Sequence, residues 1–452
     1  MPTLKDVDPE IATLLRQETR RQRNTISLIA SENYASRATL EAQGSILANK
    51  HGQGAVGDRG SGGCRYVDEI ETCAIERAKR LFGADHANVQ AATASIGNLA
   101  VLHALLQPGD TVLAMQREHG GHSTHGGATN LSGRIYRFVF YSLDPRTEQL
   151  DYDAIRARAL ETKPRLLIAG ATNYSRLIDF ATFRQIANEV GAFLMVDMAH
   201  IVGLIIAGLH PNPVPHAHVV TTSTHKTLRG PRGGGLILCT QDLARRIDDA
   251  VSPGLQAAPM LDVIASRAVL FREAATPQFR AYQVQVLRNA KTLSDTLLAE
   301  GFRIVSGGTD THLMLLDLTP TPVRGEAGQA ILESVGIIVS KARIPFDESG
   351  GSPCGGLRLG TPAITTRGMK EGGVRQIAGI LSRVLRNCGD TRALKQARTE
   401  VARLVRALPL FSSEWDVPSE QGGAPGLEPR TLVADDASDA SRLVGGEGLG
   451  YV

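Results

Sequence analysis

The stretch "VVTTSTHKTLRGPRGGG", residues 219–235, joins an apolar run to hydroxyl groups, one lysine and a series of glycines. With His218, the apolar run has the character of a buried strand, and Lys226 follows its end. Open α/β proteins place ligand sites where strands end in such turns. A loop lysine more often pairs with a carboxylate, but a desolvated one can act as an amine nucleophile. Lys226 is therefore the first candidate functional residue.

Outward from this stretch, apolar runs alternate with helical patterns, which favours a mostly parallel sheet covered by helices. We expect buried strands at 111–115, 165–170, 192–197, 218–222 and 235–239. We expect helices at 95–106, 151–162 and 181–190. The predicted fold class is a three-layer α/β/α arrangement with a smaller α+β C-terminal domain.

The flanking regions predict the domain organisation. Helices are expected at 8–22, 39–52, 67–83, 262–301, 325–335, 366–386 and 391–407, and strands within "RIVSGG", "HLMLLDL" and "GLRLG". The predicted parts are a helical arm (1–50), a large α/β domain (51–285), a small α+β domain (286–412) and a disordered or loosely packed tail (413–452).

Composition excludes several classes of function. The chain has 452 residues, 42% hydrophobic and 21% charged, and its net charge of +3 argues against a nucleic-acid partner. Five widely spaced cysteines without a CxxC pair favour neither disulfides nor zinc and fit a cytoplasmic location. The beginning of the chain does not resemble a signal peptide, and no apolar run approaches the roughly 20 residues of a membrane span.

A lysine that forms a Schiff base with pyridoxal phosphate needs an acid for the ring nitrogen and a cradle for the phosphate. Asp197 ends the apolar run of "FLMVDMAH", although an aspartate there is more often a helix cap. Thr93, Ala94 and Ser95 begin a helix, where backbone N–H groups bind phosphate, although the same pattern is also an ordinary N-cap.

Three histidines lie in "REHGGHSTHGG": His119, His122 and His125. A metal site is one interpretation, but the paired glycines disfavour a rigid ligand set and no acidic cluster lies beside them. A histidine stacked on a flat cofactor is the preferred interpretation.

From about residue 5 to 410 the chain resembles serine hydroxymethyltransferase. The motifs that carry the resemblance are "LIASENYAS", "EAQGSILANK", "NVQAATASIGN", "HGGHSTHG", "MVDMAHIVGLIIAG", "HPNPVPHAHVVTTSTHKTLRGPRGG", "VSGGTDTHL" and "LRLGTPAITTRG". The resemblance implies pyridoxal 5'-phosphate as cofactor, the aspartate-aminotransferase fold type, and a homodimer with shared active sites, or a tetramer.

The resemblance also implies residue roles. Lys226 is the Schiff-base lysine, Asp197 pairs with the pyridine nitrogen, His122 stacks on the ring, and His200 lies near the ring hydroxyl. The candidate catalytic residues are Lys226, His122, Asp197 and His225. The remaining cofactor residues are Thr93, Ala94, Ser95, Thr172, Ser223, Ala257 and Ala258. The candidate substrate-binding residues are Ser31, His51, Gln53, Ser61, His200 and Arg358. An arginine is the natural partner for a substrate carboxylate.

Departures from the family pattern lie mainly on the folate side. In "HGQGAVGDRGSGG" (51–63), Gln53 replaces the acid–base carboxylate, His51 replaces a tyrosine that reaches the neighbouring subunit, and Gly60 and Ser61 replace two pocket tyrosines. At positions that contact the pteridine, Arg117 and Ser123 replace apolar residues and Ala342 replaces an asparagine.

Two further departures concern glycines. Ala257 and Ala258 replace glycines that approach the cofactor phosphate from the partner subunit, and "GPRGGGLI" has one extra glycine. If positions 257 and 258 require a positive φ, alanine costs on the order of 1 kcal/mol there.

Because the changes concentrate on the folate side, we expect a repurposed enzyme rather than drift or an inactive homologue. The expected reaction makes or breaks the Cα–Cβ bond of a β-hydroxy-α-amino acid through a glycine quinonoid, as an aldolase or transaldolase. Its substrates would be glycine, threonine or serine and an aldehyde, with tetrahydrofolate doubtful. His122, His51 or a water could be the base. The alternatives are folate-dependent serine chemistry, racemisation or transamination at Cα, and a non-enzymatic cofactor-binding subunit.

Overall fold

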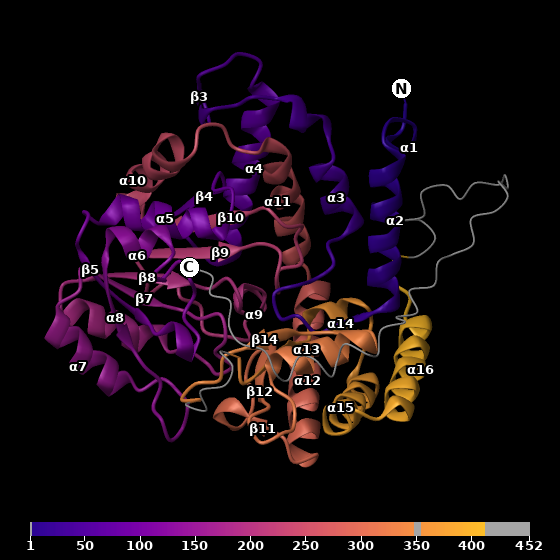
Figure 1. Ribbon diagram of the computed structural model, residues 1–452. Helices are drawn as coiled ribbons and strands as arrows, with labels where there is room; N and C mark the ends of the chain where they lie inside the picture. Colours follow the sequence, from indigo (N-terminus) through magenta and orange to yellow (C-terminus); the bar gives the residue numbers. More distant parts are fainter. Residues whose placement is uncertain (1, 348–353, 412–452) are drawn as a thin grey trace. The chain divides into compact units, whose positions relative to one another are not determined.

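The computed structural model describes residues 2–347 and 354–411 (Figure 1), so the tail predicted at 413–452 lies outside the described residues. Its main sheet has seven strands in the order β4-β10-β9-β8-β7-β5-β6, all parallel except β10. The strands are β4 (His86–Asn88), β5 (Thr111–Met115), β6 (Arg137–Tyr141), β7 (Leu166–Ala169), β8 (Phe193–Asp197), β9 (Val219–Ser223) and β10 (Gly235–Cys239).

Both faces of this sheet are covered. Alternate residues of a strand point to opposite faces, so Val112 and Ala114 pack in one core while Leu113 and Met115 pack in another. The first core also holds residues of α5 and α10, and the second holds residues of α4, α7, α8 and α11. This confirms the predicted α/β/α class.

The helices follow the chain between the strands. Up to β10 they are α1 (Leu4–Val7), α2 (Pro9–Asn24), α3 (Arg37–Gln43), α4 (Arg65–Phe82), α5 (Ala94–Leu105), α6 (Leu131–Ile135), α7 (Tyr152–Thr162), α8 (Phe180–Glu189) and α9 (Val202–Ile206). After β10 they are α10 (Ala244–Asp249), α11 (Leu261–Ala274), α12 (Pro277–Ala299), α13 (Gly325–Ser334), α14 (Pro362–Thr366), α15 (Glu371–Arg386) and α16 (Thr391–Ala407). None of these helices has the length and apolar character that crossing a bilayer requires.

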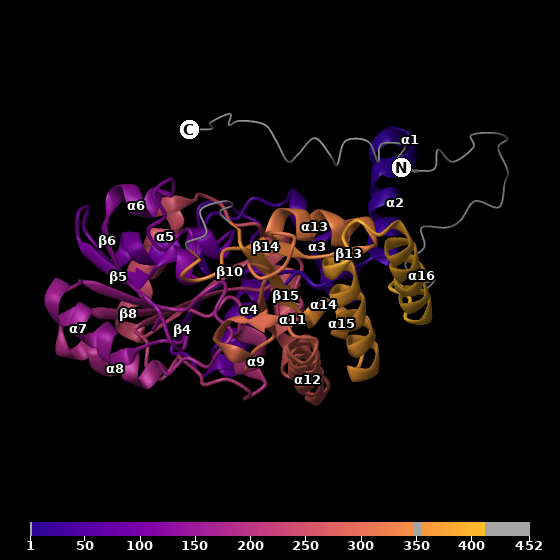
Figure 2. The ribbon, with the colours of Figure 1, turned by 60° about the horizontal axis from the view of Figure 1, so that its bottom comes forward.

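A second, antiparallel sheet has the order β11-β12-β15-β14. Its strands are β11 (Arg303–Ile304), β12 (Leu313–Asp317), β14 (Ser340–Ala342) and β15 (Gly356–Gly360). A separate core unites this sheet with α12, α13, α15 and α16, and α15 lies between α12 and α16 in both views (Figures 1 and 2). The early strand β1 (Ile26–Ser27) pairs with β13 (Ile337–Ile338), so Ile26 and Leu28 join this core.

Three predicted helices are wrong in extent. The helix expected at 39–52 stops at Gln43, where Gly44 caps it, and continues only as the 3-10 turn Ile46–Asn49. The stretch expected at 262–301 breaks before Pro277, which has no N–H to continue a helix, and Thr276 caps the new helix. The helix expected at 366–386 starts at Glu371, after Gly368 turns the chain at φ +94°.

Candidate functional site

A cavity of about 390 Å³ opens at the carboxyl ends of β7, β8 and β9. Twelve of the predicted site residues line it: Ser31, Thr93, Ala94, Ser95, His122, Thr172, Asp197, His200, Ser223, His225, Lys226 and Arg358. They come from both sheets and from segments far apart in the chain, so the tertiary fold creates this site.

Lys226 lines the cavity three residues after the end of β9. Burial lowers the pKa of its amine to about 8; the charge of Asp197 opposes this shift, and Arg358 and Arg232 add to it. The backbone around it is held by Asn33, which donates to the Lys226 carbonyl at 2.9 Å. A lysine with such a pKa is partly unprotonated near neutral pH and can therefore act as a nucleophile.

Asp197 is 9% exposed at the end of β8, and both of its oxygens are occupied. One accepts a hydrogen bond from the Ala199 N–H at 3.0 Å, and the other accepts from Asn98 Nδ2 at 2.9 Å and lies 3.2 Å from His125 Nε2. Burial raises the pKa of this carboxyl, but the hydrogen bond and charge of His125, with the charges of His122 and Lys226, hold it well below its usual range. Asp197 is therefore an ionised carboxylate inside the protein.

Sequence reasoning did not assign Asn98 or His125 to this carboxylate. Asn98 lies one turn into α5, and Thr221 of β9 fixes it by donating to its Oδ1 at 2.6 Å. His125 follows His122 by three residues in the histidine motif. Asn98 lies four residues after Ala94, so the sequence could have placed both side chains on the same face of α5. The contact between His125 and Asp197 of β8 joins distant segments, and no local pattern predicts it.

The histidine motif divides between two places. His119 packs its ring against Phe346 at 4.4 Å, away from the cavity. The ligand atoms of His122, His125 and Asp197 lie within 4.8 Å of one another, an arrangement that could suit a metal. Because protein donors already occupy both Asp197 oxygens, we favour hydrogen bonding over metal ligation. His122 Nδ1 lies 2.7 Å from the Thr124 hydroxyl, and burial lowers the pKa of His122 to about 4, so its ring is neutral.

The beginning of α5, which also lines the cavity, offers hydrogen-bond donors. Thr93 caps α5 through the Ile96 N–H, which leaves the N–H groups of Ala94 and Ser95 without acceptors in the helix. The glycine run closes tightly over this turn, because a Cβ on Gly235 would lie 2.3 Å from the Thr93 carbonyl oxygen. His225 adds a buried Nδ1 that has no partner among the described residues. An anion is the natural occupant of such a turn.

Arg358 projects from β15 toward the same cavity. Its guanidinium donates to Asn173 Oδ1 at 3.0 Å and to the Thr172 carbonyl at 3.3 Å, and lies 3.4 Å from Ser31 Oγ. Burial lowers its pKa to about 10, so it stays charged at neutral pH. Its Nε is buried without an acceptor among the described residues, and no described carboxylate pairs with it. The site therefore presents an uncompensated cation.

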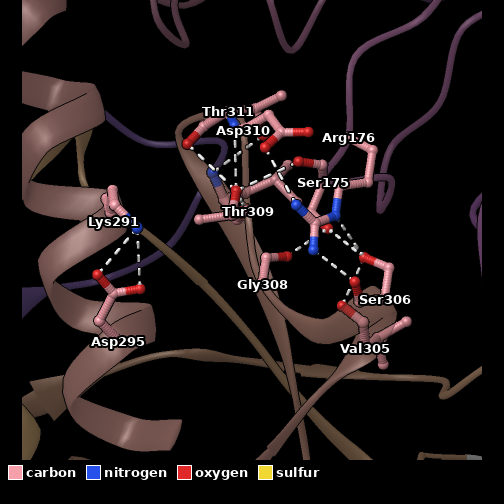
Figure 3. A network of polar contacts seen from close by, with 11 residues as sticks. Ser175, Arg176, Lys291, Asp295, Val305, Ser306, Gly308, Thr309, Asp310 and Thr311 are labelled. Atoms are coloured by element: carbon pink, nitrogen blue, oxygen red, sulfur yellow. Dashed lines mark hydrogen bonds and ion pairs between the residues drawn. The ribbon is translucent and has the colours of Figure 1, made fainter.

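The loop that supports Arg358 is itself fixed, as Figure 3 shows. Arg176 donates to Asp310 at 3.0 Å and to the Ser306 hydroxyl at 3.1 Å. Ser175 donates to the Gly308 carbonyl at 3.1 Å. This network ties the loop after β7 to the segment before β12 and so joins the two sheets beside the cavity.

His200 lies deep in the cavity against a second histidine. Its Nδ1 is 3.4 Å from His312 Nε2, and the rings stack with centroids 5.6 Å apart. Burial lowers both pKa values, that of His312 to about 3. His312 lies in the motif "VSGGTDTHL", which supports the family resemblance, but the sequence alone did not indicate a role for this residue.

Five predicted residues do not line this cavity: His51, Gln53, Ser61, Ala257 and Ala258. The resemblance assigns several of them to a partner subunit's site, and that assignment stays a prediction. Neither Ala257 nor Ala258 has a positive φ, so the strain considered for alanine does not arise. The loop that carries His51 and Gln53 is anchored by Arg59, which binds Glu71 at 2.5 Å and Asp68 at 2.8 Å.

These groups fit pyridoxal phosphate. The helix N-terminus and His225 suit its phosphate, the Asp197 carboxylate suits a protonated ring nitrogen, and the neutral ring of His122 offers a flat contact. Lys226 lies in the same cavity with an amine of lowered pKa. The chemistry of the donors thus matches an anionic, aromatic, aldehyde-bearing cofactor.

A comparison with protein families identifies the chain. The model of the family described as serine hydroxymethyltransferase matches residues 4–381, which is most of the chain. Members of this family are pyridoxal-phosphate-dependent enzymes that act on amino acids. The chain therefore belongs to the serine hydroxymethyltransferase family.

Proposed function

We propose that the protein makes or breaks the Cα–Cβ bond of a β-hydroxy-α-amino acid without tetrahydrofolate, as an aldolase or transaldolase acting on glycine or threonine and an aldehyde. The observation that carries the proposal is a contrast. Ten of the twelve predicted cofactor-binding residues line one cavity, whereas position 53, where the family pattern has an acid–base carboxylate, is a glutamine that cannot transfer a proton.

When bound, pyridoxal phosphate supplies an electron-withdrawing ring that stabilises negative charge on Cα. Asp197 would keep a proton on the ring nitrogen, and Asn98 and His125 keep Asp197 ionised and oriented. Lys226 would hold the cofactor through its amine, which lies in the cavity and has a lowered pKa. Thr93, Ala94, Ser95, Ser223, His225 and Thr172 hold the cofactor from the walls of the cavity.

The substrate carboxylate binds Arg358, which lacks a carboxylate partner among the described residues, and Ser31 lies beside it. This contact fixes the orientation of the bond that breaks relative to the ring. His122 acts chiefly by packing, because a histidine with a pKa of about 4 is a weak base at neutral pH. A water, or His51 from a partner subunit, is the better candidate to accept the hydroxyl proton.

Loss of an acid–base carboxylate typically costs about 10²- to 10⁴-fold in rate. We therefore expect folate-dependent cleavage of serine to be slow. Threonine cleavage, which releases acetaldehyde, needs no folate and should be retained.

The test uses purified holoprotein with threonine or serine, with and without tetrahydrofolate, and measures acetaldehyde and glycine. Acetaldehyde from threonine at a folate-independent rate supports the proposal. Serine turnover that requires tetrahydrofolate, without acetaldehyde from threonine, would favour the ordinary family reaction. If glycine and threonine left the visible absorbance of the cofactor unchanged, a non-enzymatic role would be favoured.

A further inference from the structure

We infer that a second cavity, formed where α4, α9, α11 and α12 meet, binds a small soluble anion that carries two or more phosphate groups. This cavity has a volume of about 600 Å³, and four arginines line it: Arg77, Arg80, Arg272 and Arg280. None of its lining residues belongs to the cavity that holds Lys226.

The charged side chains that line this cavity are all basic. The whole chain balances 49 basic against 46 acidic residues, yet no acidic residue among those that the structure describes lines the cavity. Two acids adjoin lining residues in the sequence, and each has another partner: Glu273 accepts a hydrogen bond from Ser36 at 2.7 Å, and Glu76 lies 3.4 Å from the Lys79 amine. Four like charges around one hollow repel one another, and a multivalent anion would remove that repulsion.

The arginines are available to a ligand. Arg77 is held in place by a 2.5 Å hydrogen bond to the Ala268 carbonyl. Arg80, Arg272 and Arg280 are exposed, and none of their side chains has a hydrogen bond or ion pair to another described residue. Guanidinium groups bind phosphate oxygens in pairs, so three free arginines around a fixed fourth suit more than one phosphate group.

The volume of the cavity and the side chains that line it restrict the class of ligand further. Its volume lies in the range of small-molecule sites and exceeds what a single orthophosphate fills. Leu81, Ile206 and Phe279 contribute apolar surface between the arginines. The cavity therefore suits an organic polyphosphate, with phosphates on the arginines and an apolar or planar body against these three side chains.

The test measures binding of tripolyphosphate to the holoprotein by calorimetry and by thermal denaturation. The cofactor occupies its own phosphate site in the holoprotein, which keeps that site from competing. Potassium chloride at matched ionic strength controls for screening. We expect tripolyphosphate to bind and to raise the unfolding temperature above the chloride control, because a ligand that binds only the folded state stabilises it.

The diagnostic variant is Arg272→Gln with Arg280→Gln, and the matched control is Arg65→Gln with Arg245→Gln. The control removes the same net charge from exposed arginines elsewhere, whose side chains are 80% and 93% exposed. Loss of charge-assisted hydrogen bonds should weaken binding by about tenfold or more in the first double variant alone. Equal binding in both variants, or no stabilisation beyond chloride, would overturn the inference.

Discussion

The cavity at the strand ends and the loop at 51–63 are both held by buried polar contacts, but they differ in the reactive side chains that they carry. In the cavity, Asp197, Asn98 and Thr221 form a continuous hydrogen-bonded chain between α5, β8 and β9. In the loop, Arg59 is buried against Glu71, and positions 53, 60 and 61 carry glutamine, glycine and serine. The loop thus has a buried anchor but no carboxylate at position 53. The proposed change of reaction depends on this difference between the two regions.

The largest effect should come from Lys226→Ala, which removes the amine that we propose holds the cofactor. We expect threonine cleavage to fall by about 10²- to 10⁴-fold and the visible absorbance of the bound cofactor to disappear. The unfolding temperature of the apoprotein should change little, which separates a chemical loss from a folding loss. Wild-type activity in this variant would break the comparison, because the cavity would then not be the catalytic region.

Arg59→Ala tests the loop at 51–63. It leaves Glu71, which is 3% exposed, as a buried carboxylate without its cation. Such a loss typically costs about 3–5 kcal/mol of unfolding free energy. Denaturant titration measures this, with the exposed Arg65→Ala as control. A change below about 1 kcal/mol, the usual worth of a surface ion pair, would mean that Arg59 does not anchor the loop.

The pH dependence of apoprotein stability follows from the pKa of Lys226. Because the folded-state pKa of about 8 lies below the ordinary 10.5, the unfolded chain binds more protons between these values. Wild-type stability should therefore rise relative to Lys226→Met as the pH increases from 8 to 10.5, by about 3 kcal/mol in total. Denaturant midpoints across this range check the result. A constant difference would mean that the amine is not desolvated.

Gln53→Ala should have the smallest effect. A glutamine cannot shuttle a proton, so threonine cleavage should change only slightly, with kcat compared at saturating threonine. Gln53→Glu provides the sharper comparison. If Gly60, Ser61, Arg117 and Ser123 replace pocket residues, as the resemblance predicts, one added carboxylate should not give efficient serine cleavage. A large gain in tetrahydrofolate-dependent activity in Gln53→Glu would show that the pteridine site is otherwise intact.

The sequence predicts well the features that depend on local order. Lys226 and Asp197 follow apolar runs, so their places at strand ends could be read directly, and Gly83 ends α4 with a positive φ as expected for a helix cap. It predicts less well what depends on contacts between distant segments. His125 meets Asp197 across 72 positions and His312 meets His200 across 112, and neither pairing leaves a local pattern. Pro277 is a local signal for the start of a new helix, but the apolar periodicity continues on both sides of it and favours one long helix.

The most direct test of the central claim compares one holoprotein preparation with and without tetrahydrofolate, using threonine as substrate and acetaldehyde as the measured product. The account predicts the same rate of acetaldehyde release in both samples. A rate that depends on tetrahydrofolate, or no acetaldehyde in either sample while serine is cleaved with folate, would contradict it.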